Sequence, residues 1–424
     1  MTVALDKNPA PEGPPEPPKD TSAAPRPGLL RRALDGYLYG NQVVVTVLAF
    51  FCALVVGAVL IALADQKTRT ALGYFTDSPG DTFSSAWRAI SAGYSALFRG
   101  AVFDTNSLYS NGGVAVFGPI SNTLLNAGPL ILGGLAVTVA FRTGLFNIGV
   151  QGQLIMGAIC AGYVGFAWHL PSGIHLIVAL VAGILGGAVW GGLVGVLKAR
   201  TGAHEVITTI MLNYVAYYLL GYLLTVNGFQ APNSTEATTS PIDSTARLPH
   251  LFESTHFGLV LALLAAVGAW WLLTRSTLGF SLKAIGANAA AARTAGMSVG
   301  RGIITAMVIS GALAGLVGCS QVLGTRGVLT QDVDAGFGFD AITVALLGRG
   351  SAYGTVLAGI LFGAFRAGGV VMGAQTDTPP DVVSVIAPVM VLFIAAPALI
   401  RGLFRLRASR GGTGVGALAK GWNG

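Results

Sequence analysis

Charged residues are scarce in this sequence. Asp, Glu, Lys and Arg make up 10% of its 424 residues, whereas apolar residues make up 53%. A soluble domain carries roughly 25% charged residues and needs them at its surface. The high apolar content also excludes a disordered chain. With a mean hydropathy of +0.68, the composition therefore indicates an all-α polytopic membrane protein.

Cysteine is equally rare. Cys52, Cys160 and Cys319 each lie in an apolar stretch, so we interpret them as small core residues and not as a disulfide framework. Neither the cysteines nor the five histidines show the spacing of metal ligands, and no metal site is expected.

The sequence has no phosphate-binding loop, because it contains neither G-x-x-x-x-G-K-[ST] nor any Gly-Lys pair. The pattern G-x-S-x-G does occur, at Gly296–Gly300. A nucleophile elbow needs a preceding strand, however, and an alanine-rich helical stretch precedes this one. We therefore expect no enzyme activity, no catalytic residue and no cofactor in this chain.

The two ends of the chain differ from its middle. Residues 1–35 are rich in proline from Pro9 to Pro27 and lack apolar periodicity, which predicts a disordered cytoplasmic tail. Residues 36–405 form the predicted transmembrane domain, and residues 406–424 form a second cytoplasmic tail.

Apolar stretches long enough to cross a bilayer, about 20 residues each, recur along the transmembrane domain. The nine candidates are Gln42–Ala64, Ile120–Phe141, Ile148–Trp168, Ile174–Leu197, Val206–Val226, Phe257–Thr274, Ile303–Gly324, Gly354–Met372 and Val382–Leu399. A tenth stretch, Phe339–Leu347, has only half the required length.

Lysine and arginine orient these segments, since they gather on the cytoplasmic side of membrane proteins. If Phe339–Leu347 counts as a crossing, 18 basic residues lie on the cytoplasmic side and 6 outside. We therefore predict ten transmembrane segments with both termini in the cytoplasm. Residues 65–118, with a possible interfacial helix at Phe83–Phe103, and residues 227–255 become extracellular loops. The alanine-rich, basic residues 275–301 become a cytoplasmic loop.

Two predicted segments begin irregularly. Asn147, Gln151 and Gln153 lie in a glycine-rich stretch at the start of one, and Gly336–Asp340 leads into the half-length segment. Broken helices are typical of a transport pathway. Asn147, Gln151, Gln153 and Asp340 thus either line such a pathway or bond neighbouring helices together.

Three further polar residues lie in or beside predicted spans. Glu205 begins one of them, where it either complements the helix dipole or takes part in gating. Asn213 lies two turns further along and is a further candidate to line the pathway. Arg366 lies within another span and is expected to pair with an acid or to extend to the interface.

Two patterns concern packing. Gly183, Gly187, Gly191 and Gly195 recur every four residues, which favours close helix packing within the fold or, alternatively, a dimer face. The two irregular segments follow spans of opposite direction, so we predict an inverted 5+5 repeat.

Four stretches resemble one known family: Gly133–Gly157, Glu205–Tyr214, Leu282–Met297 and Gly338–Gly348. They resemble the permeases of ABC importers in the branched-chain amino acid and simple sugar superfamily. The match is best with the larger permease subunit of nucleoside importers that use a BmpA-type lipoprotein.

The resemblance implies a subunit of the bacterial inner membrane that imports nucleosides by alternating access. Its implied partners are a second, different permease, a cytoplasmic ATPase that binds ATP, and a BmpA-like lipoprotein; no nucleic acid partner is expected. The implied ATPase coupling loop contains Lys283, Gly286, Asn288, Arg293 and Gly296.

Two alternatives stay open. The first is a permease for a simple sugar such as ribose, or for another small metabolite. The second is an ion-driven secondary transporter, which usually has acidic or histidine relays inside its spans. Only His204, Glu205 and Asp340 could serve as such a relay here.

Overall fold

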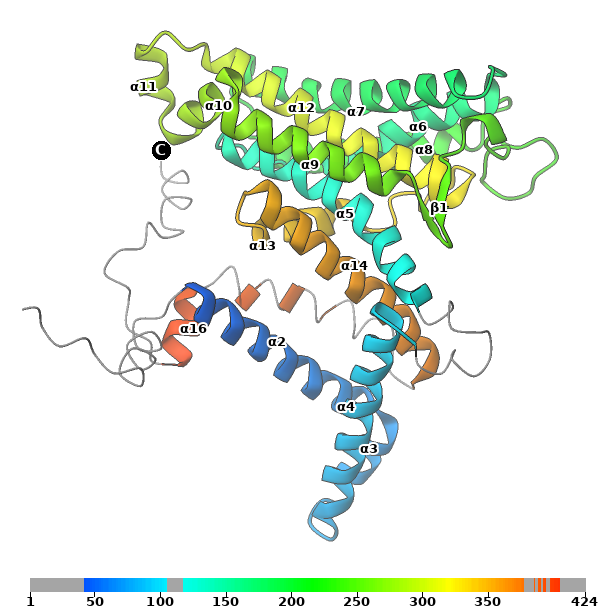
Figure 1. Ribbon diagram of the computed structural model, residues 1–424, viewed down its shortest axis with the longest axis vertical. Coiled ribbons are helices and arrows are strands. Elements are labelled where there is room, and N and C mark those ends of the chain that lie inside the picture. Colours follow the sequence, from blue (N-terminus) through cyan, green and yellow to red (C-terminus); the bar gives the residue numbers. More distant parts are fainter. Residues whose placement is uncertain are drawn as a thin grey trace, which may run out of the picture.

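The computed structural model describes residues 42–104 and 117–376, and in the C-terminal region residues 385, 388–389, 392–393 and 397–404. Its helices are α2 (Gln42–Ala64), α3 (Gln66–Leu72), α4 (Pro79–Ala101), α5 (Gly118–Arg142), α6 (Val150–Ala167), α7 (Ile174–Thr201), α8 (Glu205–Leu223), α9 (Gly258–Arg275), α10 (Thr277–Ala287), α11 (Ala289–Thr294), α12 (Val299–Cys319), α13 (Phe337–Leu347), α14 (Ala352–Gln375) and α16 (Pro397–Leu403). Figure 1 shows how they are arranged.

Within the described residues, eight helices are long and apolar enough to cross a membrane, and α13 is a shorter apolar helix. They confirm eight of the nine predicted full-length spans. Helix α2 has the predicted bounds, and every other boundary lies within four residues of the prediction when α12 is taken with its continuation to Arg326. The ninth span, Val382–Leu399, and both tails lie largely outside the described residues, so the count of ten stays a prediction.

The helices pack in two groups around α5 and α14. Helices α5, α6, α7, α8, α9 and α12 form the larger group, and α13 and α14 pack against α5. Helix α2 lies on the other side of α14, where Ala49 and Ala53 share a small apolar core with Phe365 and Ile400 (Figure 1). The largest core contains fully buried side chains such as Leu130, which lies in α5.

Glycines let α7 and α12 touch at the backbone. A side chain at Gly187 or at Gly311 would collide with the carbonyl oxygen of the other residue. A Cβ at Gly157 of α6 would lie 2.6 Å from the Cα of Gly315. The four-residue glycine repeat of α7 therefore packs helices within the chain, as small residues do in membrane bundles.

Helices α5 and α12 run in opposite directions. The first turn of α5 bonds to Thr255 through Ser121, and the last turn of α5 lies beside Gly286. The order is reversed in α12, which begins beside Ile285 and continues to Thr325, a neighbour of His256. Their neighbours also correspond, because α5 packs on α14 and α13 while α12 packs on α7 and α6. An inverted repeat that relates α5–α6–α7 to α12–α13–α14 has this pattern of pairs.

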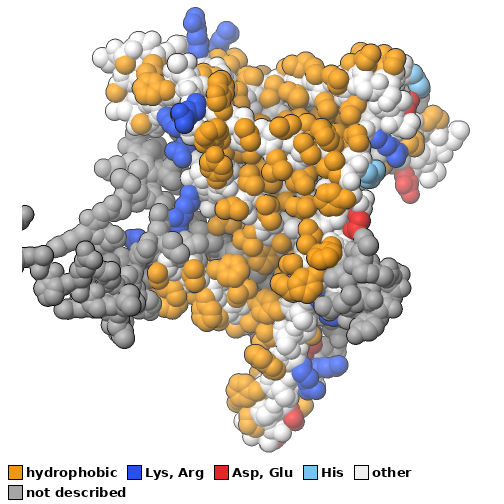
Figure 2. Space-filling model, viewed as in Figure 1, with side chains coloured by type: hydrophobic (Ala, Val, Ile, Leu, Met, Phe, Trp, Pro, Cys, Tyr) orange, Lys and Arg blue, Asp and Glu red, His pale blue; other side chains and the backbone are white. Residues whose placement is uncertain are grey.

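The predicted loops contain secondary structure. Residues 65–118 include α3 and the amphipathic α4, whose Phe83, Trp87 and Phe98 are exposed. Residues 227–255 carry the short helix η3 (Ser244–Ala246) and most of a small hairpin, β1 (His250–Phe252) and β2 (Thr255–His256), the one pair of strands in the described chain. Figure 2 shows a largely apolar surface across the helices, as contact with lipid requires.

Candidate functional site

The two irregular segments meet inside the bundle. Helix α6 begins at Val150 after a non-helical stretch, and α13 begins at Phe337 after Gly336, which has a φ of 76°. A Cβ at Gly338 would lie 2.5 Å from the Cβ of Gln151, so only glycine allows this contact. The sequence predicted both irregular starts, and the structure brings them together.

Asn147 and Gln153 form a closed hydrogen-bond network. The Asn147 amide donates to Gln153 Oε1 at 3.1 Å and to Ser310 Oγ of α12 at 2.8 Å, while its Oδ1 accepts from Gly149 N at 2.8 Å. Asn147 and Gln153 are both fully buried. These side chains therefore hold the non-helical stretch against α12, with their hydrogen-bonding groups directed at protein.

Asn213 of α8 holds the start of α6 from the other side. Its Oδ1 accepts from Gly152 N at 2.8 Å, and its Nδ2 donates to Ile148 O at 3.0 Å. The first N–H groups of a helix have no partner within the helix. A side chain of a neighbouring helix supplies one here, for Gly152 N.

Charged and amide groups surround the contact between the two helix starts. Arg366 Nη1 lies 3.1 Å from Asp340 Oδ2, and its guanidinium stacks on the Phe337 ring, 4.1 Å from the centroid. Gln151 Nε2 donates to Asp334 Oδ2 at 3.0 Å, whereas Gln151 Oε1 is buried without a hydrogen-bond partner among the described residues. Gln151 is thus a predicted pathway residue with an unsatisfied acceptor in this part of the chain.

Glu205 forms an ion pair near the end of the bundle. Its Oε2 lies 2.6 Å from Lys198 Nζ, and it begins α8, where the helix dipole favours a negative charge. Its Oε1 also accepts a long 3.5 Å bond from Phe146 N, in the non-helical stretch before α6. The carboxylate therefore joins the ends of α7 and α8 to the broken segment.

The C-terminal end of α12 departs from α-helical geometry. Residues Ser320–Arg326 form a π-helix, η4, beside the buried His256. Gly258 N donates to His256 Nδ1 at 3.0 Å, so Nε2 carries the proton and donates to Thr325 Oγ1 at 3.1 Å. Burial lowers the pKa of His256 to about 4, and the ring is neutral at pH 7.

The predicted coupling loop folds as two short helices joined at Asn288. The Oδ1 of Asn288 caps α11 by accepting from Ala291 N at 3.0 Å. In α10, a Cβ at Gly286 would lie 2.6 Å from Arg142 O, so α10 packs directly against the end of α5. Arg293 and Gly296 are exposed, and Lys283 is half-buried. Figure 2 shows basic side chains near this end of the molecule.

Several residues of the site escaped the sequence analysis. Ser310, Asp334, Lys198 and His256 each bond a predicted residue or an irregular segment. Asp334 had a usable signal, since it lies two residues before Gly336. The described residues contain no group of three or more His, Cys, Asp or Glu side chains able to hold a metal ion.

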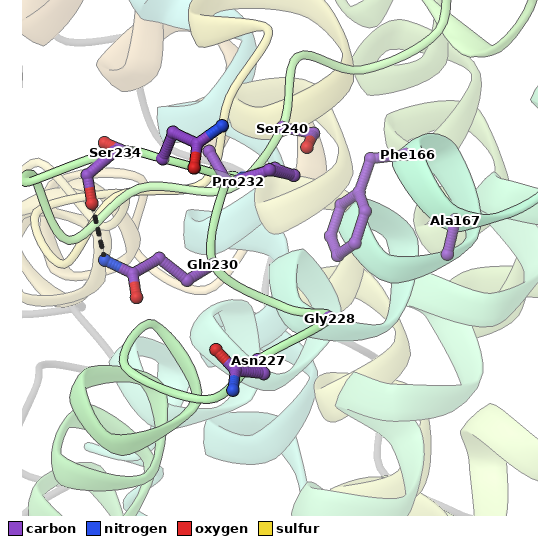
Figure 3. A pocket seen from close by; sticks show the side chains of 10 residues that line it. Phe166, Ala167, Asn227, Gly228, Gln230, Pro232, Ser234 and Ser240 are labelled. Carbon is purple, nitrogen blue, oxygen red and sulfur yellow. Dashed lines mark hydrogen bonds between the residues drawn. The ribbon is translucent and has the colours of Figure 1, made fainter.

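A polar pocket of about 380 Å³ lies between the C-terminal end of α6 and the loop that follows α8 (Figure 3). Phe166 of α6 forms one wall, and Asn227, Gln230 and Ser240 of that loop form others. None of its lining residues belongs to α13 or to the start of α6, so the pocket is separate from the Gln151–Gly338 contact.

Comparison with known proteins identifies the class. The family described as branched-chain amino acid transport system / permease component matches residues 119–395. The guanosine ABC transporter permease protein NupP of Bacillus subtilis is 41% identical over 74% of this chain and 88% of its own length. The glucose ABC transporter permease protein TsgB13 of Haloferax volcanii is 35% identical, over 65% of this chain and 75% of its own. The nucleoside ABC transporter permease protein NupB of Lactococcus lactis is 34% identical, over 66% and 80%.

The fold and these matches define a multi-pass membrane permease. No solved structure matches the chain. The chain belongs to the branched-chain amino acid transport system permease family, whose relatives named above are permease components of ABC transporters.

Proposed function

We propose that this permease moves nucleosides into the cell as one subunit of an ABC importer. The observation that carries the proposal is the likeness to NupP and NupB, which are named for guanosine and nucleosides. A small neutral solute also suits the site, where the Arg366 guanidinium is already paired with Asp340. An anionic substrate would need free positive charge.

The proposed complex contains a second permease, an ATPase that binds ATP, and a BmpA-like lipoprotein. Bacillus subtilis has two guanosine permease proteins similar to this chain, NupP and the less similar NupQ at 25% identity, which supports a pair of different permeases. The chain itself would hold no cofactor. In the bacterial inner membrane it would have ten transmembrane segments and cytoplasmic termini.

The packing of α10 suggests how the ATPase acts on the pathway. Gly286 lies against the backbone from Arg142 to Gly144, immediately before the non-helical stretch that contains Asn147. A push on the loop would therefore reach the start of α6 through a short, closely packed route. ATP binding to the partner would in this way alternate access between the two sides.

Uptake of labelled nucleosides by cells with and without this gene tests the substrate. We expect deletion to abolish guanosine uptake, and unlabelled nucleosides, but not ribose or glucose, to compete with it. Unchanged nucleoside uptake in the deletion strain would refute the proposal.

A sugar permease is the second candidate, because TsgB13 is named for glucose and is 35% identical. The same competition panel separates the two. Loss of glucose or ribose uptake on deletion, with nucleoside uptake intact, would keep the family and change the substrate.

A further inference from the structure

Helix α8 packs with one face and leaves the other bare. Thr209, Asn213 and Ala216 are buried, and among the described elements α8 packs on α6 and, less extensively, on α7. The opposite face carries Tyr214 and Tyr218, which are 58% and 67% exposed. Tyr222 continues the same face at the extracellular end, so tyrosines recur every four residues along it.

The depth of Tyr214 makes this face unusual for contact with lipid. It is the tenth of the 19 residues of α8, roughly 13 Å from either end at 1.5 Å per residue. Tyrosine normally lies at the membrane interface, where its hydroxyl reaches water. Within the described part of the chain, the Tyr214 hydroxyl has no hydrogen-bond partner, and an unpaired hydroxyl is unfavourable in hydrocarbon.

Other exposed helix faces have a different composition. The bare face of α7 carries Ile177, Val181, Leu185 and Val189, and that of α2 includes Val55 and Val59. Aliphatic side chains are what a lipid-facing helix presents. The bare face of α8 also carries the exposed Ile207 and Met211, but the hydroxyls of Tyr214 and Tyr218, which define its tyrosine face, favour a neighbour more polar than lipid.

We propose that the tyrosine face of α8 lines the water-filled transport pathway and that Tyr214 and Tyr218 stack on the flat aromatic base of a nucleoside. The inference rests on the proposed function for its substrate. Aromatic side chains bind bases of any sequence by stacking, since every base has a flat π-face. The Tyr217 ring braces Tyr218 in an edge contact, with centroids 5.5 Å apart.

The position of this face links a bound base to the broken helix. Asn213, which holds Gly152 and Ile148 of the α6 start, is the residue immediately before Tyr214. At the extracellular end, the Gln331 amide lies against Gly221, 3.0 Å from where a Cβ would be. Gln331 precedes Asp334 in the stretch that leads to α13. Helix α8 thus contacts both irregular segments through residues that neighbour Tyr214 and Tyr222 in the sequence.

Thiol accessibility tests whether water reaches this face. Tyr214→Cys and Tyr218→Cys would be made singly in the assembled importer, with Cys52, Cys160 and Cys319 replaced by alanine. Val189→Cys on α7, at an equally exposed apolar position, is the matched control. We expect a membrane-impermeant thiol reagent to modify the two α8 positions, guanosine to slow that modification, and Val189→Cys to stay unmodified. If the α8 positions are as unreactive as Val189→Cys, lipid or a dry contact with the second permease covers the face, and the proposal is wrong.

Transport kinetics test stacking. Tyr218→Phe keeps the ring and should leave the KM for nucleoside uptake within about twofold, whereas Tyr218→Leu should raise it roughly tenfold. Equal KM values for Phe and Leu variants would overturn the stacking role. If the importer moves only sugars while both cysteines still react, the proposed function fails and the water-lined face stands, so the two failures are distinguishable.

Discussion

Replacing Asn213 tests how the broken start of α6 is held. Asn213→Ala leaves Gly152 N and Ile148 O buried without their partner. Each unsatisfied buried group costs about 1–3 kcal/mol, so the folded state should lose about 2–6 kcal/mol. A loss of 1 kcal/mol lowers Tm by about 2–4 °C in chains of 150–250 residues and by less in a chain of 424 residues, so the expected decrease is about 2 °C or more.

The measurement is thermal unfolding of the detergent-solubilised protein, followed by the loss of its monodisperse chromatographic peak. Asn126→Ala is the control, because that amide bonds only to Asn122 O within α5, and its Tm should change by no more than about 1 °C. Asn213→Leu separates the effect of the lost hydrogen bonds on Tm from the effect of the lost side-chain volume, since leucine fills a space similar to that of asparagine but forms no hydrogen bonds. If Asn213→Leu restores the original Tm, the cavity and not the hydrogen bonds explains the effect, and the reasoning is refuted.

Three other changes should have specific effects. Arg366→Ala leaves Asp340 unpaired and should reduce nucleoside uptake about tenfold or more. Adding Asp340→Asn to this variant should restore part of the lost uptake. Normal uptake in the Arg366→Ala variant would show that the ion pair is dispensable. The pKa of His256 is about 4 in the folded state against an ordinary 6.5, so the neutral ring contributes at most about 3 kcal/mol to the free energy of unfolding. This contribution is complete above pH 6.5 and is lost as the pH falls toward 4. His256→Asn should flatten the curve of stability against pH across this window, and an unchanged curve would contradict the assignment. Gly311→Leu should separate α7 from α12 and abolish folded protein in membranes, whereas Gly402→Leu, with open space around its Cβ position, should not.

The spans could be predicted from sequence because each is a continuous apolar run. Even the half-length segment was visible, as Phe339–Leu347, since Gly336 and Gly338 interrupt the apolar pattern before it; helix α13 begins two residues earlier, at Phe337. The partners of the polar residues could not be predicted. Asn213 bonds to Gly152 only because α8 packs on α6, and the sequence of neither helix alone indicates that the two helices are in contact.

The π-helix η4 and the hairpin β1–β2 were also beyond the sequence analysis. Ser320–Arg326 continues the helical pattern of α12 in the sequence, and the His256 ring packs against Gly324 within the wider turn. His256 itself has no distinguishing neighbour in the sequence. Its role becomes visible only when β2 brings it to the end of α12.

The most direct test of the central claim is transport by the purified importer in proteoliposomes. The complex of both permeases, the ATPase and the lipoprotein would be reconstituted, and labelled guanosine uptake measured with and without ATP. We predict accumulation that requires ATP hydrolysis and is unaffected by ionophores that dissipate ion gradients. Guanosine accumulation driven by an ion gradient without ATP would contradict the account, as would ATP-driven accumulation of glucose but not of guanosine.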